Sequence, residues 1–142
     1  MTTSGSGKPA WVLEHLERYI ATDGDDGHMW RGTPTLLLTT TGRKSGREIT
    51  TPLIYGTHEG NCIVVASRGG APDHPQWYYN LSANPSVRVQ VAADKFNATA
   101  RTANPEEKTA LWQLMAGIYP PYDEYQAKTE RVIPVVILER AA

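Results

Sequence analysis

The spacing of apolar residues predicts a short amphipathic helix near the start of the chain. Within residues 9–21, apolar side chains recur at Val12, Leu16, Tyr19 and Ile20. These intervals match the period of an α-helix. Such a helix has one apolar face to bury, so we expect it to cap the body of the fold or to border a ligand pocket.

Beyond residue 32 the pattern changes to short runs of β-branched and apolar residues, which are typical of β-strands. The predicted strands cover residues 35–41, 49–56, 62–67, 86–91, 95–102 and 132–138. Glycine-containing turns at residues 42–46 and 58–61 separate the first three strands. Because Pro52 has no N–H group, it places the second strand at a sheet edge or at a bulge.

Two more helices are predicted among these strands. A short one covers residues 75–81, and a longer one begins at Asn104, which can cap it, and Pro105, which suits the first helical position. Two glutamates follow in the first turn, where they interact favourably with the helix dipole. We expect this helix to end near Gly117, because two consecutive prolines follow, and we expect residues 119–125 to be irregular.

Strands joined mostly as hairpins, with three short helices, predict a mainly antiparallel β-sheet closed into a barrel with flanking helices. The chain lacks both the alternation of strand and helix and the G-x-G-x-x-G motif of a Rossmann domain. Residues 1–8 are polar and rich in Gly and Ser, so we expect a disordered tail there and a single domain over residues 9–142.

Charge and composition narrow the function. The net charge of −1 argues against nucleic-acid binding, which needs a basic excess. Cys62 is the only cysteine, so an intrachain disulfide is excluded and a reducing, cytoplasmic location is expected. No apolar stretch approaches the roughly 20 residues of a membrane span. Glu14 and Glu17 on the first helix would be repelled by anionic lipid, so we predict no stable membrane association.

A basic turn between the first two strands is a candidate anion site. In the run Gly-Arg-Lys-Ser-Gly-Arg (residues 42–47), the glycines permit a tight turn and the arginines can grip phosphate or carboxylate oxygens. Lys44 adds a point charge and Ser45 a hydroxyl. A solvated basic hairpin turn would have the same composition, so the residues alone leave both interpretations open.

Three other segments can form a pocket for a flat molecule, although each could also be purely structural. Ser67 precedes Arg68 and two glycines, where a ligand can approach the backbone closely. Residues 76–80 place three aromatic rings on one short helix, and three tyrosines lie within residues 119–125. The sequence has no metal-ligand spacing and no G-x-S-x-G elbow, so we expect no metal and chemistry that depends on a bound cofactor.

In their order and spacing, these four segments resemble the deazaflavin-dependent nitroreductase family of actinobacteria, also called F420-dependent quinone reductases. The matching stretches are LLLTTTGRKSGREITTPL (residues 36–53), VVASRGGAPDHPQWYYNL (residues 64–81), Asn84-Pro85 and YDEYQAKTERVIP (residues 122–134). The resemblance implies a split β-barrel, related to the barrels that bind flavin mononucleotide (FMN), and it implies the deazaflavin F420 as cofactor.

The resemblance also implies which residues hold the cofactor. The phosphate and oligoglutamate tail of F420 would meet the basic turn, and its ring would lie between the following strands and the tyrosines. The implied cofactor-binding residues are Arg43, Lys44, Ser45, Ile49, Thr50, Thr51, Pro52, Leu53, Ile54, Val65, Ala66, Ser67, Arg68, Gln76, Trp77, Tyr78, Tyr79, Asn80 and Tyr122. Relatives often carry a basic residue in place of Ile49, and here Arg47 can substitute for it.

The implied reaction transfers a hydride from reduced F420 to a planar, lipophilic small molecule, such as a quinone, nitroaromatic, enone or coumarin-like lactone. Ser67, Tyr122 and Tyr125 are the candidate catalytic residues, because each has a hydroxyl that can supply a proton or a hydrogen bond. Two alternatives stay open: an FMN-binding oxidoreductase on the same barrel, and a carrier that binds F420 or a lipophile without catalysis. A homodimer is compatible with each of them.

Overall fold

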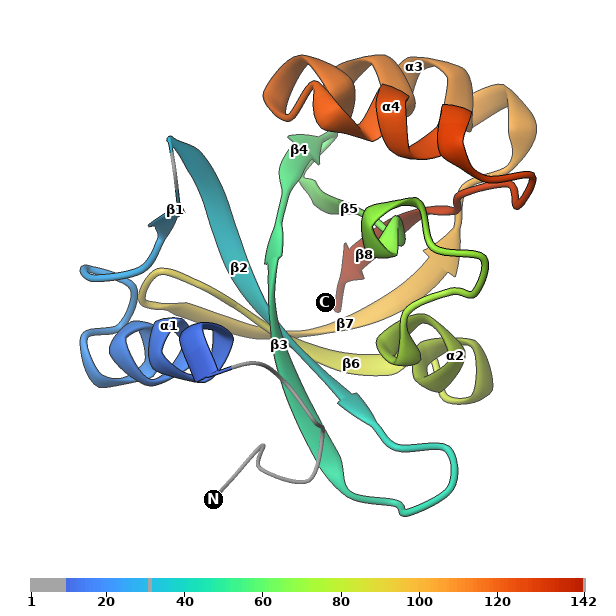
Figure 1. The fold of residues 1–142 in the computed structure, drawn as a ribbon. Coiled ribbons are helices and arrows are strands. Elements are labelled where there is room, and N and C mark those ends of the chain that lie inside the picture. The colour runs from blue at the N-terminus through green and yellow to red at the C-terminus, as the bar shows by residue number, and fades with distance from the viewer. Residues whose placement is uncertain (1–9, 31, 142) are drawn as a thin grey trace.

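The computed structural model describes residues 10–30 and 32–141, whose arrangement is shown in Figure 1. The predicted tail at residues 1–8 lies outside the described residues. The helices are α1 (Ala10–Ala21), the short 3-10 helix η2 (Arg68–Gly70), α2 (Gln76–Ala83), α3 (Pro105–Ile118) and α4 (Pro121–Lys128). The strands are β1 (Met29–Trp30), β2 (Thr33–Thr41), β3 (Glu48–Ile54), β4 (Gly56–His58), β5 (Asn61–Val65), β6 (Ser86–Val91), β7 (Asp94–Thr102) and β8 (Val135–Arg140).

The strands form one antiparallel sheet in the order β1-β2-β6-β7-β8-β5-β4, with β3 added alongside β2. β3 pairs with β2 over its whole length, and β4, at the other end of the sheet, pairs with β5. Only Tyr55 separates β3 from β4, so one bent stretch of chain joins the two ends of the sheet and makes it a split barrel (Figure 1). The predicted fold is confirmed, and Pro52 lies in a strand that pairs on one side only.

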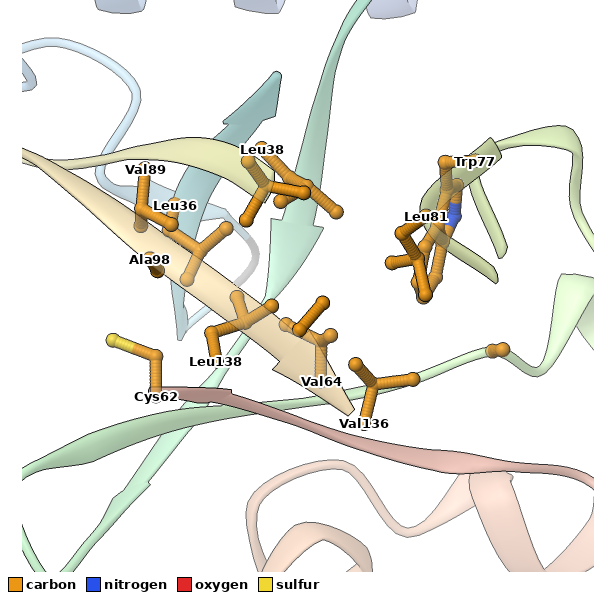
Figure 2. Close-up of a cluster of buried hydrophobic side chains, with 13 residues drawn as sticks. Leu36, Leu38, Cys62, Val64, Trp77, Leu81, Val89, Ala98, Val136 and Leu138 are labelled. Carbon is orange, nitrogen blue, oxygen red and sulfur yellow. The ribbon is translucent and has the colours of Figure 1, made fainter. Parts of the chain in front are cut away.

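Side chains that alternate along the strands fill the barrel. Leu36 and Leu38 of β2 are fully buried in the same cluster as Val64 of β5 (Figure 2). Leu37 lies on the opposite face of β2 and packs against Tyr19 of α1. Each buried leucine contributes roughly 1.5–3 kcal/mol relative to an exposed one. The apolar face of α1 and the alternation of β2 therefore fix the helix against the outside of the barrel.

Strand β5 is buried on both of its faces. Val64 faces the barrel core, whereas Ile63 and Val65 pack with Leu111 and Met115 of α3. This second cluster places α3 and α4 over the β5 and β8 side of the barrel, as Figure 1 shows. Burial on both faces explains why β5 is a continuous apolar run instead of an alternating one.

The start of α3 follows directly from its sequence. The Asn104 side chain accepts a hydrogen bond from the Glu107 main-chain N–H at 2.8 Å, and the Glu107 carboxylate accepts one from the Asn104 N–H at 3.0 Å. This capping box, with Pro105 at the first turn, satisfies N–H groups that would otherwise have no partner. The predicted beginning of the helix is confirmed.

Three sequence predictions are wrong. Residues 121–125 are helical and not irregular, because Pro121 lies in the first turn of α4, where a missing N–H costs no helical hydrogen bond. The last strand begins only at Val135, after a proline, and Val132 is 71% exposed. Ile20 was placed on the buried face of the first helix but is 53% exposed, while His15 is buried there instead.

Two further observations concern what the described residues do not contain. No helix among them is long and apolar enough to cross a membrane. No group of three or more His, Cys, Asp or Glu side chains in residues 10–30 and 32–141 is arranged to hold a metal ion.

Candidate functional site

A cavity of about 280 Å³ lies between α1, β3, α2, α4 and the loop that follows β5. Pro52, Leu53 and Ile54 of β3 form one wall, and Val65 and Trp77 contribute from β5 and α2. The lining is mainly aromatic and aliphatic with a few polar groups, which is the usual composition of a small-molecule site. The cavity therefore lies at the end of β3 that is farthest from the basic turn.

Helix α1 forms a second wall of the cavity. Trp11, Val12 and His15 line it, and the buried His15 ring donates from Nε2 to the Gly27 carbonyl at 2.6 Å. Because a carbonyl only accepts hydrogen bonds, this contact fixes the proton on Nε2. The Trp11 ring stacks on Trp30, with 5.8 Å between centroids and 12° between planes. The helix thus gives the cavity an aromatic edge.

Three tyrosines form a third wall. The hydroxyls of Tyr119 and Tyr125 share a hydrogen bond of 3.2 Å, whereas no hydrogen bond among the described residues uses the hydroxyl of Tyr122. The bond to Tyr119, together with burial, raises the pKa of Tyr125 to about 12. Burial also raises the pKa of Tyr122, which is only 5% exposed. Both phenols therefore remain protonated near neutral pH, and the Tyr122 hydroxyl is available to a ligand.

The loop after β5 has an unusual backbone. Arg68, Gly69 and Gly70 all have positive φ angles, of 47°, 62° and 81°. A Cβ on Gly70 would lie 2.7 Å from the carbonyl oxygen of Tyr125, so only glycine allows α4 to approach the loop this closely. Ser67, Arg68 and Gly69 line the cavity. A ligand in the cavity would therefore meet main-chain atoms as well as side chains.

The basic turn lies between β2 and β3, at the opposite end of β3 from the cavity. The main-chain N–H of Gly42 donates to the Arg47 carbonyl at 2.7 Å, and the Ser45 hydroxyl accepts from the Arg47 N–H at 3.1 Å. Arg43, Lys44 and Arg47 are exposed, and none of the ion pairs among the described residues involves them. Three cations without a carboxylate partner suit an anionic ligand.

Helix α2 connects the basic turn to the cavity. The Arg43 guanidinium donates to Gln76 at 2.9 Å and to the side-chain oxygen of Asn80 at 3.1 Å, and it lies 5.0 Å from the centre of the Tyr79 ring. The buried Asn80 also accepts from the Arg43 main-chain N–H at 3.1 Å. Trp77, on the same helix, lines the cavity. Helix α2 therefore contacts both the basic turn and the cavity.

The structure brings together part of the predicted site. The predicted residues that line the cavity are Pro52, Leu53, Ile54, Val65, Ser67, Arg68, Trp77, Tyr122 and Tyr125. Those outside it are Arg43, Lys44, Ser45, Ile49, Thr50, Thr51, Ala66, Gln76, Tyr78, Tyr79 and Asn80. Among the latter, Thr50 bonds to the Thr39 hydroxyl at 2.8 Å, and Tyr78 bonds to the Thr102 hydroxyl at 2.8 Å. These two hydroxyls serve contacts within the protein.

Sequence reasoning missed several residues of the site. Trp11, His15, Trp30 and Thr35 line the cavity from segments that come before the basic turn. The amphipathic pattern left open whether the helix caps the barrel or borders a pocket, and it did not show which side chains face the pocket. The guanidinium of Arg131 is bonded to the loop after β5. Arg131 belongs to residues 122–134, which carry part of the family resemblance, but the sequence predicted no function for it.

A split barrel with an aromatic cavity and a separate basic turn suits a flat cofactor with an anionic tail. The chain belongs to the F420H(2)-dependent quinone reductase family, whose model matches residues 11–140. It is 41% identical over 130 residues to an F420H(2)-dependent quinone reductase of Mycobacterium tuberculosis, covering 89% of this chain and 87% of that relative. The family membership makes the chain an oxidoreductase with F420 as its cofactor.

Solved structures agree with this assignment. A structure described as an F420-H2-dependent reductase has 48% identity and a TM-score of 0.70, and the match covers 75% of this chain and 94% of that one. Another, described as a domain-swapped dimer, has 45% identity and a TM-score of 0.73, with 91% of this chain and 97% of that chain covered. The similarity in sequence is thus accompanied by similarity in fold.

Proposed function

We propose that F420 lies along β3 and α2, with its acidic tail at the basic turn and its ring in the cavity. The observation that carries this placement is the pair of contacts made by α2: Gln76 and Asn80 hold Arg43 of the turn, and Trp77 lines the cavity. Exposed cations suit the phosphate and carboxylates of the tail, and an apolar cavity suits a flat ring. When bound in its reduced form, the cofactor supplies a hydride.

We propose different roles for the candidate catalytic residues. No hydrogen bond within residues 10–30 and 32–141 uses the Tyr122 hydroxyl in the cavity wall, so this hydroxyl donates a hydrogen bond to the substrate oxygen and draws electron density from the carbon that accepts the hydride. Tyr125 is bonded to Tyr119 and holds the wall in place. Ser67 contributes from the loop after β5, which also lines the cavity, through its hydroxyl and its backbone.

The proposed substrates are planar, lipophilic acceptors: quinones first, and also nitroaromatics, enones and coumarin-like lactones. The support for this class is the lining, in which Trp11, Trp30 and Trp77 offer flat apolar faces and Tyr122 offers one hydroxyl. Flat rings stack on such faces, whereas small, strongly hydrated acids gain little from them. We therefore propose broad activity toward aromatic carbonyl compounds and little toward small carboxylic acids.

A fluorescence titration tests the placement of the cofactor. F420 and FMN are added separately to the native protein, to Trp77→Phe and to Trp112→Phe. Trp112 is the matched control, because it is bonded to Asp123 and does not line the cavity. We expect F420 to quench the native protein and Trp112→Phe, with clearly less quenching in Trp77→Phe. Tighter binding of FMN than of F420 would contradict the proposal.

Turnover separates an enzyme from a carrier on the same site. With reduced F420 in excess, oxidation of the cofactor is followed by absorbance after addition of a soluble quinone, a nitroaromatic, an enone or a small carboxylic acid. We expect rapid oxidation with the quinone and slow oxidation with the acid. Tight F420 binding without oxidation by any of these acceptors would favour the carrier.

We also propose a homodimer. The support is a relative of 45% identity whose structure is described as a domain-swapped dimer and which covers nearly the whole of this chain. The molar mass in solution, measured by light scattering after size exclusion, should be twice the 15.7 kDa of the chain. A single species with the mass of one chain across the accessible concentration range would overturn this part of the proposal.

A further inference from the structure

Arg131 makes an unusually complete set of hydrogen bonds close to the cavity without lining it. Its guanidinium donates to the carbonyl oxygens of Ala66 at 3.0 Å, Ser67 at 2.7 Å and Ala71 at 3.0 Å, and to Nδ1 of His74 at 2.8 Å. All four acceptors belong to the stretch that leaves β5 and forms part of the cavity wall. The Arg131 side chain thus links both ends of the loop formed by residues 66–74.

These contacts indicate that Arg131 stabilises the backbone of this loop. None of the ion pairs among the described residues involves it. Burial lowers its pKa, yet a guanidinium keeps its charge at any physiological pH. Its planar, branched shape matches several carbonyl oxygens at once, which an ammonium group on a flexible stem cannot do. Lysine would therefore be a poor replacement.

The hydrogen bonds from Arg131 also determine where the neighbouring N–H groups of the loop point. In a trans peptide the C=O and N–H groups point in opposite directions, and no described peptide is cis. Because Arg131 holds the carbonyls of Ala66 and Ser67, the N–H groups of Ser67 and Arg68 point away from the guanidinium. Neither N–H group takes part in a hydrogen bond among the described residues.

The backbone angles of Ser67 and Arg68 also direct their N–H groups to one side of the loop. Ser67 has φ −79° and ψ −41°, whereas Arg68 has φ 47°. Successive residues of opposite hand direct neighbouring N–H groups towards one point, the arrangement that binds anions and carbonyl oxygens in backbone nests. A left-handed arginine is also a strained conformation that persists only where the surroundings enforce it. Arg131 contacts the carbonyls of Ala66 and Ser67, which lie on the two sides of the Ser67 peptide N–H and of the Ser67 Cα.

We propose that Arg131 is a positioning residue that turns the N–H groups of Ser67 and Arg68 towards the cavity, where they donate to the carbonyl edge of the cofactor ring. This inference rests on the proposed placement of that ring in the cavity. Arg131 itself touches neither cofactor nor substrate; it acts through the loop. The loop therefore arrives at the cavity with its donors already oriented, and binding does not have to order them.

The binding test compares Arg131→Gln and Arg131→Lys with Arg101→Gln. Arg101 is the matched control, because it also makes several hydrogen bonds, to Glu107 and Glu139, but does not line or border the cavity. We expect F420 affinity to fall about tenfold or more in Arg131→Gln, to fall less in Arg131→Lys, and to change less than twofold in Arg101→Gln. If Arg131→Gln does not fold, Arg131→Lys carries the test.

A second measurement needs no cofactor. In the native protein Nδ1 of His74 accepts from Arg131, so nitrogen NMR should show the proton on Nε2, and Arg131→Gln should disturb this signal. The same variant should change amide exchange at Ser67 and Arg68. F420 affinity equal to that of the native protein, with the His74 signal altered, would overturn the positioning role.

The two proposals fail in different ways. If the native protein does not bind F420, the proposed function is overturned. In that case the amide exchange of Ser67 and Arg68 still decides on Arg131: a change in Arg131→Gln supports the positioning role, and identical exchange in both proteins overturns it. Chemical rescue adds a further check, since methylguanidinium should restore affinity in Arg131→Ala but not in an Arg43→Ala variant.

Discussion

The two ends of β3 carry candidate binding regions of different kinds. At the Glu48 end, the basic turn is held by hydrogen bonds within residues 42–47 and by Gln76 and Asn80 of α2, and its cations are exposed. At the Ile54 end, the cavity is assembled from α1, α2, α4 and a loop whose carbonyl groups accept hydrogen bonds from Arg131. One end is charged and exposed, whereas the other is apolar and closely packed.

This difference determines what each end can tolerate. Attraction between exposed charges falls off gradually with distance and is screened by salt, so small movements of the turn cost little. Contacts in a packed wall depend on shape, and a shift of a few tenths of an ångström is felt. The cavity end should therefore be sensitive to added volume and insensitive to salt, and the turn should show the reverse behaviour.

Adding one methyl group to the loop should have the largest effect. In Gly70→Ala the new Cβ would lie 2.7 Å from the Tyr125 carbonyl oxygen and 3.0 Å from its Cα, at a φ of 81°. Overpacking and left-handed strain together should destabilise the fold by about 2–5 kcal/mol. Urea denaturation measures this. Gly69→Ala is the control, because its φ is 62° but no atom lies within 4 Å of the added Cβ; an equal loss in both variants would contradict the packing argument.

Removing charge from the turn should have the next largest effect. Arg43→Ala and Lys44→Ala should each weaken F420 binding by about ten- to a hundredfold, since a charge-assisted contact contributes roughly 1.5–3 kcal/mol. Both should also flatten the dependence of affinity on salt. Lys95→Ala is the control, because Lys95 pairs with Asp23 on another part of the surface. A double variant that binds F420 like the native protein would show that the turn is only a solvated hairpin.

Much of the fold could be predicted from the sequence because its signals are local. The capping residues at Asn104 fix the start of α3, and the strand β6 follows from its alternation. The residues of the basic turn also lie next to one another in the chain. Composition and spacing are enough to identify a feature whose residues lie in one short stretch, although they did not reveal the bonds from Arg43 to Gln76 and Asn80.

The cavity could be predicted only in part, because its members meet through tertiary contacts. His15 lines it because its ring bonds to Gly27, a residue in a loop without a periodic pattern. The helical conformation of Tyr122 and Tyr125 was missed because two prolines normally end a helix, yet here the second one begins the next helix. No spacing rule connects Arg131 to the loop at residues 66–74, more than fifty residues earlier.

Removing single hydroxyls from the tyrosine wall should have a smaller effect that separates its members. Tyr122→Phe should lower kcat about tenfold with little change in F420 affinity, because its hydroxyl has no partner in the described part of the chain and can bond to the substrate. Tyr125→Phe should lower kcat less, because its hydroxyl bonds to Tyr119. Steady-state kinetics at saturating cofactor measures both. Weaker cofactor binding with unchanged kcat would show that Tyr122 holds the ring instead.

The smallest expected effect is a loss of stability at alkaline pH, which depends on the tyrosines of the cavity. The bond to Tyr119 and burial raise the pKa of Tyr125 to about 12 in the folded protein, whereas a tyrosine in the unfolded chain ionises near pH 10. Between these values the unfolded state has lost a proton that the folded state keeps, so stability must fall as pH rises from about 10 to 12. Urea denaturation between pH 9 and 11.5 should show this slope, and Tyr125→Phe should make it shallower. Tyr78→Phe, which removes a hydroxyl bonded to Thr102 on the exposed surface, is the control. Equal slopes for the native protein and Tyr125→Phe would mean that the tyrosine wall does not favour the protonated phenol.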